Sequence, residues 1–477
     1  MMSEKYIIGI DEGSQSAKIL IFDTKGKIVC EAKHNLKPYD LPRPGFVEHP
    51  GDDWWDAICI ASKKCMEKFK GNKNDIVGIG LCTIRYCRAY LRQDGSLAQP
   101  ALSWMDIRVS QPYSHTNDDI KYIVASSGYI THRLTGEYKD TVANYEGGWP
   151  IDTDRWEWSQ NPSDYVETGM PRSMLFDLVM PGEILGYITE KAAEETGFPK
   201  GLPVIATSND KAVEGLGAGC TGDTTVCISL GTYTAAMMEG KENLKETKAV
   251  WPKFACIPNK YLYDSNGIRR GMWTVSWFRD ILGEGYQKCA MEQGLSPEEL
   301  LSVEAEKVPV GSDGLMTILD WLAPVDAQYK RGMMIGFDGR HTRGHIYRSI
   351  LEAIALTMKK HVMDMVDELN VDMKKIIITG GGSNSDLFMQ IFSDVFGIPA
   401  VRNEVNGAAG LGAAICVAVA TGIYPSFEEA VENMVRIKDE FIPKEQNVEL
   451  YKTIYPIYTG ITKYTDPLLK NAYGILE

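Results

Sequence analysis

The sequence predicts an α/β protein built from two related units, and three observations lead to this prediction. A hairpin of apolar strands with a polar tip opens the chain, and a hairpin of similar design returns near its middle. Elsewhere, short apolar runs alternate with amphipathic helical patterns. That alternation is typical of a mixed or parallel sheet covered by helices. We therefore expect a duplicated α/β unit, with the two hairpin tips facing a cleft between the copies.

The first hairpin lies at the start of the chain. Residues 6–10 (YIIGI) form an apolar run typical of a strand buried on both faces. Residues 11–16 (DEGSQS) predict a polar turn that contains a glycine, and residues 19–23 (ILIFD) predict the returning strand.

The second hairpin repeats this design in weaker form. Residues 225–230 (TVCISL) predict a strand, residues 231–234 (GTYT) a turn and residues 235–238 (AAMM) the returning strand. Because each hairpin opens roughly half the chain, we place a domain boundary just before the second one. The predicted domains are residues 1–222 and 223–477.

Further runs fill in the two units. Residues 77–81, 203–207 and 375–379 are strand-like, and residues 346–369 carry apolar side chains at helical spacing. The latter pattern predicts a long helix with one buried face. Residues 407–414 (GAAGLGAA) predict a helix of small residues that packs tightly beside the glycine-rich loop after residue 379.

The charge of the chain bears on its partners. Lys plus Arg number 50 and Asp plus Glu 64, which gives a formal net charge of −14. A protein that binds a phosphate backbone needs a basic stripe, so we do not expect nucleic acid as the main partner.

The cysteines and the chain start bear on location. The ten cysteines are scattered without a CxxC pair. The first residues include charged side chains and lack the apolar region of a signal peptide. Residues 405–427 carry no charge but are rich in Gly and Ala, which favours a buried helix over a membrane span. We expect a cytoplasmic protein with reduced thiols and no membrane partner.

The first hairpin tip has the chemistry of a phosphate site. Phosphates need backbone N–H groups and small hydroxyls at close range. The tip offers them at Gly13, Ser14, Gln15 and Ser16, with the positive charge of Lys18 nearby. Asp11 at the strand end could hold a hydrated Mg²⁺. An ordinary polar hairpin is the alternative, and it applies equally to Gly231 and Thr232 in the second tip.

A third loop, residues 379–386 (TGGGSNSD), joins a buried strand to a helix. Its glycines would let a flat ring or a phosphate approach the backbone, and the helix N-terminus favours anionic groups. The loop is not GxGxxG, and no acidic residue completes a ribose site behind it, which disfavours a dinucleotide fold.

Asp210 is the clearest candidate for a catalytic base. It follows an apolar strand and opens a helix rich in small residues, at the kind of strand end where α/β proteins bind substrates. Phosphoryl transfer asks mainly for orientation of the attacking hydroxyl, which a carboxylate can supply. The alternative is that Asp210 only caps the helix.

Polar clusters after two apolar runs could form a polyol pocket. Arg85 follows one run, and Trp104 and Asp106 follow another. A guanidinium, a carboxylate and an indole would supply hydrogen bonds and a flat stacking surface. Surface ion pairs with a core tryptophan are the alternative. His341 and His345 share helical spacing but lack the Glu of a zinc motif, so we expect structural or capping roles.

Taken together, the blocks resemble the FGGY family of carbohydrate kinases, within the actin-like and Hsp70-like ATPase superfamily. The resemblance runs from Tyr6 to near Ala430 and rests on segments in family order: GIDEGSQSAKILIFD, PGFVEHPGDDWWDA, WMDIR, YITHRLTGE, SNDKAVEGLGAG, SLGTYTA, HTRGHIYRSILEAIA and IIITGGGSNSDLFMQIFSDVFGIPA. It implies two ribonuclease-H-like domains that flank a deep interdomain cleft.

The resemblance also implies an activity and its residues. The family transfers the γ-phosphoryl group of MgATP to a hydroxyl of a sugar or sugar derivative, here a ketopentose such as xylulose or ribulose, a polyol or a sugar acid. By resemblance, Asp210 is the catalytic base and Asp11 the residue that binds Mg²⁺. The implied nucleotide-binding residues are Gly13, Ser14, Gln15, Ser16, Lys18, Gly231, Thr232, Gly381, Gly382 and Ser385. The implied substrate-binding residues are Arg85, Trp104, Asp106, Asp210 and Lys211.

Three departures from the family pattern concern the substrate. Tyr86 follows Arg85 where glycerol kinases carry Glu, Lys211 stands where many members have Gln, and the stretch between Arg108 and Tyr129 is shorter than in most relatives. A lysine beside the site could favour an acidic sugar, neutralise a phosphate or point away.

Two other functional classes remain open. One is a nucleotide-dependent sensor of the same fold that phosphorylates no sugar, and the other is a ribonuclease-H-like nuclease, which needs clustered carboxylates and two metal ions. We leave a homodimer open as well.

Overall fold

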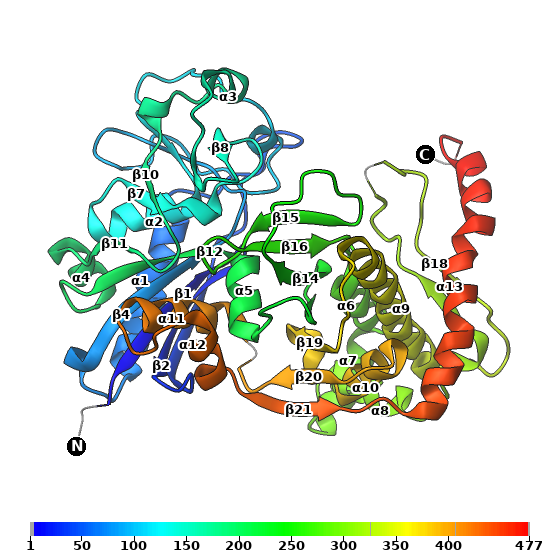
Figure 1. The fold of residues 1–477 in the computed structure, drawn as a ribbon. Helices are drawn as coiled ribbons and strands as arrows, with labels where there is room; N and C mark the ends of the chain where they lie inside the picture. The colour runs from blue at the N-terminus through cyan, green and yellow to red at the C-terminus, as the bar shows by residue number, and fades with distance from the viewer. Residues whose placement is uncertain (1–3, 325, 406, 476–477) are drawn as a thin grey trace.

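The computed structural model describes residues 4–324, 326–405 and 407–475. Two large β-sheets, one in each half of the chain, form its framework, and helices pack around both (Figure 1). Within the described residues, no helix combines the length and the apolar character that a membrane crossing requires.

The first sheet has the strand order β11-β12-β4-β1-β2-β3. Its strands are β1 (Tyr6–Glu12), β2 (Ser16–Asp23), β3 (Ile28–Asn35), β4 (Ile76–Thr83), β11 (Ile184–Tyr187) and β12 (Pro203–Asn209). β1 pairs antiparallel with β2 and parallel with β4, and β4 pairs parallel with β12. On one face, side chains of β1 and β4 share a core with α1 (Asp53–Lys68) and α2 (Ser126–Thr135).

The second sheet has the strand order β15-β16-β14-β13-β19-β20-β21. Its strands are β13 (Thr225–Leu230), β14 (Thr234–Gly240), β15 (Val250–Phe254), β16 (Tyr261–Ser265), β19 (Lys375–Thr379), β20 (Ala400–Asn403) and β21 (Ile437–Phe441). β13 pairs antiparallel with β14 and parallel with β19, as β1 does with β2 and β4. The two predicted hairpins and the duplicated α/β unit are therefore confirmed, and the structure adds that each hairpin has a parallel strand beside it.

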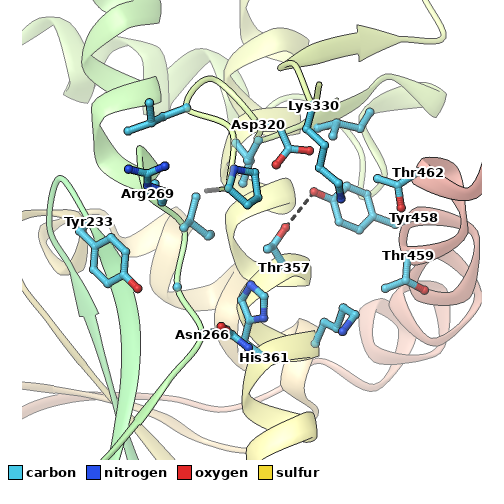
Figure 2. Close-up of a pocket in the computed structure, with 17 residues that line it drawn as sticks. Tyr233, Asn266, Arg269, Asp320, Lys330, Thr357, His361, Tyr458, Thr459 and Thr462 are labelled. Atoms are coloured by element: carbon cyan, nitrogen blue, oxygen red, sulfur yellow. Dashed lines mark hydrogen bonds between the residues drawn. The ribbon is translucent and has the colours of Figure 1, made fainter. Parts of the chain in front are cut away.

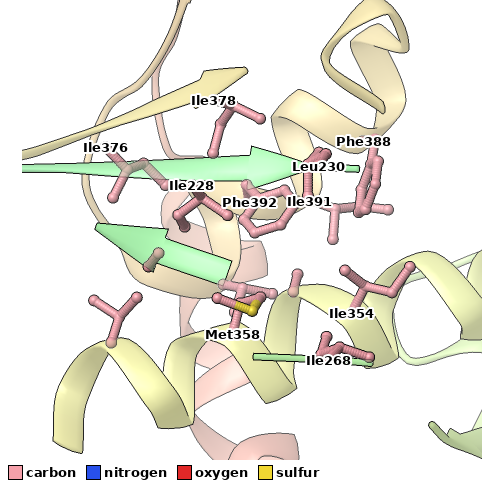
Figure 3. Close-up of a cluster of buried hydrophobic side chains, with 14 of the residues drawn as sticks. Ile228, Leu230, Ile268, Ile354, Met358, Ile376, Ile378, Phe388, Ile391 and Phe392 are labelled. Carbon is pink, nitrogen blue, oxygen red and sulfur yellow. The ribbon is translucent and has the colours of Figure 1, made fainter. Parts of the chain in front are cut away.

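The core of the second half lies between this sheet and two helices. Ile228 and Ile378 of the central strands pack against Ile354 and Met358 of α9 (Arg343–Leu369) and against Phe392 of α10 (Asp386–Phe396), as Figure 3 shows. α6 (Gly271–Ile281) also contacts α9, and α13 (Glu445–Ala472) lies along the outside of this half.

The remaining elements connect these layers. They are β5 (Ala89–Leu91), β6 (Tyr122–Val124), β7 (Lys139–Thr141), β8 (Ile151–Asp152), β9 (Glu157–Trp158), β10 (Asp177–Val179), β17 (Met316–Ile318), β18 (Met333–Ile335), α3 (Pro162–Thr168), α4 (Glu190–Thr196), α5 (Asp210–Ala218), α7 (Gly283–Glu292), α8 (Pro297–Ala305), α11 (Ala408–Ala420), α12 (Phe427–Met434) and short 3₁₀ turns, among them η6 (Gly381–Asn384).

The two halves interlock through α5 and α11. α11 comes late in the chain but packs on α5, β1 and β4 of the first half, and Figure 1 shows it in orange beside the blue strands. Glycines permit this approach: a Cβ on Gly412 would lie 2.0 Å from the Val213 carbonyl oxygen, and one on Gly9 would lie 2.3 Å from that of Gly410. The predicted tight packing of this small-residue helix is present, but its partners are α5 and the first sheet.

Candidate active site

Asp210 is the first residue of α5, directly after β12 ends at Asn209. The cap of this helix is Asn209, whose side-chain oxygen accepts hydrogen bonds from the N–H groups of Lys211 and Ala212, each at 3.1 Å. The alternative that Asp210 only caps the helix is therefore wrong. The Asp210 carboxylate instead accepts a hydrogen bond of 3.3 Å from the Arg85 backbone N–H.

Asp11 lies near the end of β1, two strands across the sheet from β12. Lys18 Nζ lies 3.4 Å from its carboxylate. Burial raises the pKa of Asp11, Lys18 opposes that rise, and the charges of Asp210 and Glu214 add to it. Asp11 and Asp210 thus form an acidic region at the carboxyl ends of β1 and β12, the two strands that pair parallel with β4 on either side, and α/β proteins bind ligands at such strand ends.

This acidic region fits a hydrated Mg²⁺. The ion keeps most of its waters and is usually held by one or two carboxylates together with substrate phosphates. Asp11 is a buried carboxylate with one lysine as its partner, so a second cation beside it would lower the cost of its charge. Among the residues the structure describes, no group of three or more His, Cys, Asp and Glu side chains could hold a metal by itself.

Three backbone carbonyl oxygens of the first hairpin tip accept hydrogen bonds. The Gly13 N–H donates to the Ser16 carbonyl at 3.1 Å, the Tyr39 hydroxyl to the Ser14 carbonyl at 3.0 Å, and the Leu36 N–H to the Gln15 carbonyl at 2.9 Å. These three hydrogen bonds fix the backbone between β1 and β2. Such a preset loop is what phosphate binding by main-chain amides requires.

The second tip joins β13 to β14. The Gly231 carbonyl accepts hydrogen bonds from the Thr234 hydroxyl and from the Met272 N–H, both at 3.2 Å, whereas Thr232 is exposed at the tip. The tip is therefore tied to the start of α6.

The glycine-rich loop lies against the same strand end. Gly382 is buried, and a Cβ there would lie 2.8 Å from the Leu230 side chain, while Gly381 is exposed. Ser385 caps α10 by accepting the Phe388 N–H at 3.3 Å. The structure thus brings the second tip and the glycine loop to one end of the second sheet, and it gives the Ser385 hydroxyl a structural partner.

Lys211 points away from Asp210 toward the second sheet. Its ammonium lies 2.8 Å from Glu214 and 2.9 Å from the Ser229 hydroxyl, and Glu214 also accepts the Thr379 hydroxyl at 2.7 Å. Burial alone would lower the pKa of Lys211, but the carboxylates of Glu214 and Asp210 raise it above its ordinary value. The ammonium thus forms a link between the halves, and the substrate contact expected of Lys211 stays a prediction.

Arg85 forms a second link between the halves. Its guanidinium lies 2.7 Å from the Asp264 carboxylate of β16, and both side chains are mostly buried. The next residue, Tyr86, has a φ of 63°, in the left-handed region that a bulky residue rarely adopts. The Arg85 guanidinium carbon lies 5.1 Å and the Lys253 ammonium 5.7 Å from the centre of the Tyr86 ring.

Glu146 adds a buried carboxyl group to this region. It accepts the Phe254 N–H at 2.7 Å. Burial raises its pKa to about 7, although Lys253 and Arg85 act in the opposite direction. The region beside Asp210 therefore holds polar groups from both halves of the chain.

Trp104 and Asp106 differ in their access to ligands. The Trp104 side chain is exposed and offers a flat surface. Asp106 is fully buried, and its carboxylate accepts hydrogen bonds from the Val47 N–H at 2.7 Å and from the Arg108 N–H and guanidinium at 2.6–2.9 Å. The surrounding loop therefore holds the Asp106 carboxylate in place, and its contact with a substrate stays a prediction.

Several groups beside the site were not predicted. Glu214 follows Lys211 at i, i+3, a spacing that could have suggested their ion pair. Asp264 and Glu146 carry no such pattern, since their partners lie far away in the sequence. His345 caps α9 by accepting the Thr342 N–H at 3.2 Å, so its expected capping role is confirmed.

Comparison with known families identifies both halves. The model of the N-terminal domain of the "FGGY family of carbohydrate kinases" matches residues 6–118 and 110–217, and the model of the C-terminal domain matches residues 226–421. Together they span most of the chain.

Individual relatives agree with this match. The chain is 54% identical to a protein of Escherichia coli (strain K12) named "Uncharacterized sugar kinase YgcE", over all of this chain and 97% of that one. It is 24% identical to a xylulose kinase of Bacillus subtilis (strain 168), over 97% and 98% of the two chains.

Solved structures share the fold. The xylulose kinase from Rhodospirillum rubrum superposes with a TM-score of 0.82 at 22% identity, over 98% of this chain and all of that one. The gluconate kinase from Lactobacillus acidophilus gives a TM-score of 0.84 at 18% identity, over the whole of both chains.

Proposed function

Because the chain belongs to the FGGY family of carbohydrate kinases and is a sugar kinase with the two-domain actin-like ATPase fold, we propose that it transfers the γ-phosphoryl group of ATP to one hydroxyl of a small sugar or sugar derivative. The candidate acceptors are a ketopentose such as xylulose or ribulose, a polyol and a sugar acid. We place the enzyme in the cytoplasm, in keeping with its ten free cysteines.

One observation carries this proposal. Asn209 caps α5, so the Asp210 carboxylate is not needed for capping. The Arg85 N–H orients this carboxylate, and its charge acts on Asp11 nearby. In the proposed reaction, Asp210 accepts a hydrogen bond from the acceptor hydroxyl and aims its oxygen at the γ-phosphorus. It takes the hydroxyl proton as the new P–O bond forms and the bond from the γ-phosphorus to the bridging oxygen breaks, so that ADP leaves. A carboxylate suffices because the loose transition state depends mainly on orientation.

The nucleotide is proposed to bind at three loops. The amides of Gly13–Ser16 with Lys18, and those of Gly231 and Thr232, would hold the phosphates, and Gly381, Gly382 and Ser385 would lie near the adenosine. Asp11 would hold a hydrated Mg²⁺, which neutralises phosphate charge when bound. The contacts of Gly231 with α6 and of Gly382 with Leu230 support this assignment, because they place these loops at one end of the second sheet.

The acceptor is proposed to bind beside Asp210, Arg85 and Trp104. Arg85 would hold a hydroxyl or carboxylate, and Trp104 would cover an apolar face of the sugar. Asp106 and Lys211 act as positioning residues, since Asp106 fixes the loop around Trp104 through Arg108 and Lys211 fixes α5 against β13.

Asp210→Asn tests the proposal directly. We expect kcat to fall by about 10²–10⁴-fold, measured as sugar-dependent ADP release across a panel of ketopentoses, polyols and sugar acids. Nucleotide affinity, measured by calorimetry, should stay the same, because Asp210 accepts a hydroxyl and does not contact the nucleotide. Glu190→Gln, at an exposed carboxylate in α4, is the matched control.

The same panel separates the proposal from a nucleotide-dependent sensor. A sensor would bind ATP without sugar-stimulated turnover for any compound. Wild-type turnover in Asp210→Asn would instead show that another group orients the hydroxyl.

A further inference from the structure

A cavity of about 490 Å³ lies in the second half of the molecule, apart from the predicted site residues. Its walls come from the segment before α6, from the loop after β17, from the middle of α9 and from α13 (Figure 2). None of the residues assigned above to nucleotide, metal or sugar lines it. The chemistry proposed for the site therefore leaves this cavity without a role.

The cavity presents several polar side chains that form no hydrogen bond with other described protein groups. Among the described residues, the side chains of Asn266, Thr462 and Tyr233 have no hydrogen bond, and Asp320 has neither a hydrogen bond nor an ion pair within 4 Å. His361 Nδ1 is buried without a partner, and burial lowers the pKa of this imidazole to about 4, so it is neutral near pH 7. Figure 2 shows these groups on several sides of one hollow, an arrangement that suits a ligand with many hydroxyls.

The charge of the lining is unlike that of the chain. The lining contains three cationic side chains, Arg269, Lys330 and Lys360, and one carboxylate, Asp320. The cavity is therefore lined mainly by positive charge, although the protein has a net charge of −14. Lys360 is engaged by Asp364 at 2.6 Å, and Lys330 lies 3.6 Å from Asp466.

Arg269 is the least compensated of these cations. It donates to the Ala323 carbonyl and has no carboxylate within 4 Å among the described residues. A guanidinium in this state favours a carboxylate or phosphate group, which it can bind through two parallel hydrogen bonds.

The cavity is joined to the second hairpin tip. Tyr233, which follows Thr232, forms one wall. Burial raises the pKa of its hydroxyl and the charge of Asp264 adds to the rise, whereas Arg85 and Arg269 oppose it. Ile268, on the lining segment, exchanges two backbone hydrogen bonds of 2.7 and 3.0 Å with Thr234. A ligand that orders this segment would therefore also order the tip.

We propose that this cavity binds a small hydroxylated organic anion, either a sugar phosphate or a sugar acid, and that its occupancy changes how the second hairpin tip binds nucleotide. Arg269 holds the anionic group, and Asn266, Asp320, Lys330 and Thr462 bind the hydroxyls. The binding site is independent of the proposed function, whereas the effect on nucleotide rests on it.

Hydrogen exchange of the full-length protein tests the binding site without turnover. The probes are glucose 6-phosphate, gluconate and uncharged sorbitol, each added with saturating non-hydrolysable ATP analogue to fill the nucleotide site. We expect protection of residues 318–324 and 455–462 with one or both anions and not with sorbitol. The response to glucose 6-phosphate against gluconate distinguishes a phosphate ester from a carboxylate.

Variants localise the effect. Arg269→Ala and Thr462→Val should each weaken this protection at least tenfold in apparent affinity, and Arg269→Lys should restore part of it. Arg340→Ala, at an exposed arginine outside the cavity, is the control and should bind as the wild type does. No protection with either anion, equal protection with sorbitol, or protection unchanged in Arg269→Ala would overturn the proposal.

The coupling has its own readout. The KM for ATP should change by about fivefold or more when the anion that binds is added, as expected for a typical coupling free energy. An unchanged KM together with clear protection would refute the coupling and leave the binding site standing. A failure of the kinase assay itself would not alter the exchange result.

Discussion

Glu12 lies next to Asp11 in β1, yet its side chain faces the opposite side of the sheet. It is completely buried, and neither carboxylate oxygen has a partner among the described residues. Burial raises its pKa well above the ordinary value, and the neighbouring charges of Asp11 and Asp210 add to that rise. A neutral carboxylic acid is the form that this environment favours.

Glu12→Gln should therefore make the protein less sensitive to pH. Since the folded-state pKa of Glu12 is raised, its contribution to stability is fully present below the unfolded pKa and is lost as pH rises through the folded pKa. We measure the free energy of unfolding in urea between pH 5 and pH 8. The value for the variant minus the value for the wild type should increase as pH increases. A constant difference across that range would show that Glu12 is not protonated in the fold.

The residue scale also shows what the sequence can and cannot predict. Asp210 was placed at a strand end from the local pattern alone, because the apolar run and the helix start were both visible. Asp210 does not cap the helix because Asn209 does so. When two adjacent residues can both cap a helix, the sequence does not say which one does. The Arg85–Asp264 pair joins residues 179 positions apart, and no local pattern records such a contact.

The pattern of apolar residues predicted the two hairpins and the central strands of both sheets. β13 and β19 have the predicted bounds, whereas β1 extends through Asp11 and Glu12, which the prediction assigned to the turn. The polar character of these two residues suggested a loop, but pairing with β2 and β4 keeps them in the strand. The partners of α11 could not be predicted, since small residues indicate close packing without naming the surface.

Gly412→Ala tests the contact between α11 and α5. A Cβ would lie 2.0 Å from the Val213 carbonyl oxygen, so the helices must separate, and we expect a loss of about 1–3 kcal/mol in the free energy of unfolding. Gly460→Ala in α13 is the matched control, because a Cβ there meets nothing within 4 Å. It should raise stability by about 0.5–1 kcal/mol through helix propensity. Equal effects of the two substitutions in chemical denaturation would contradict this account.

Two polar links join the two halves of the chain close to Asp210. One is Arg85 with Asp264. In the other, Lys211 donates to Ser229 and to Glu214, and Glu214 in turn accepts the Thr379 hydroxyl. Both links lie beside the proposed reacting groups. A change in how the two halves are positioned relative to each other would therefore alter the geometry of the site. The resemblance of the sequence to a two-domain kinase predicted the two halves but not these links.

Lys211→Gln should weaken the second link. It leaves the Glu214 carboxylate buried without its ammonium partner, and we expect a loss of about 1–3 kcal/mol in the free energy of unfolding. The double variant Lys211→Gln with Glu214→Gln should recover part of this loss, because no unpaired charge remains. Additive losses in this double-mutant cycle would show that the two side chains do not interact.

The position of α11 has a practical consequence for dissection of the chain. A cut between residues 222 and 223 leaves the first fragment with one face of its sheet bare, because the helix that covers β1 and β4 is carried by the second fragment. Neither piece is then a self-sufficient folding unit, and the pair should behave as a split protein whose fragments regain activity only when mixed. A soluble version of the first piece would need the segment 408–420 grafted back onto it.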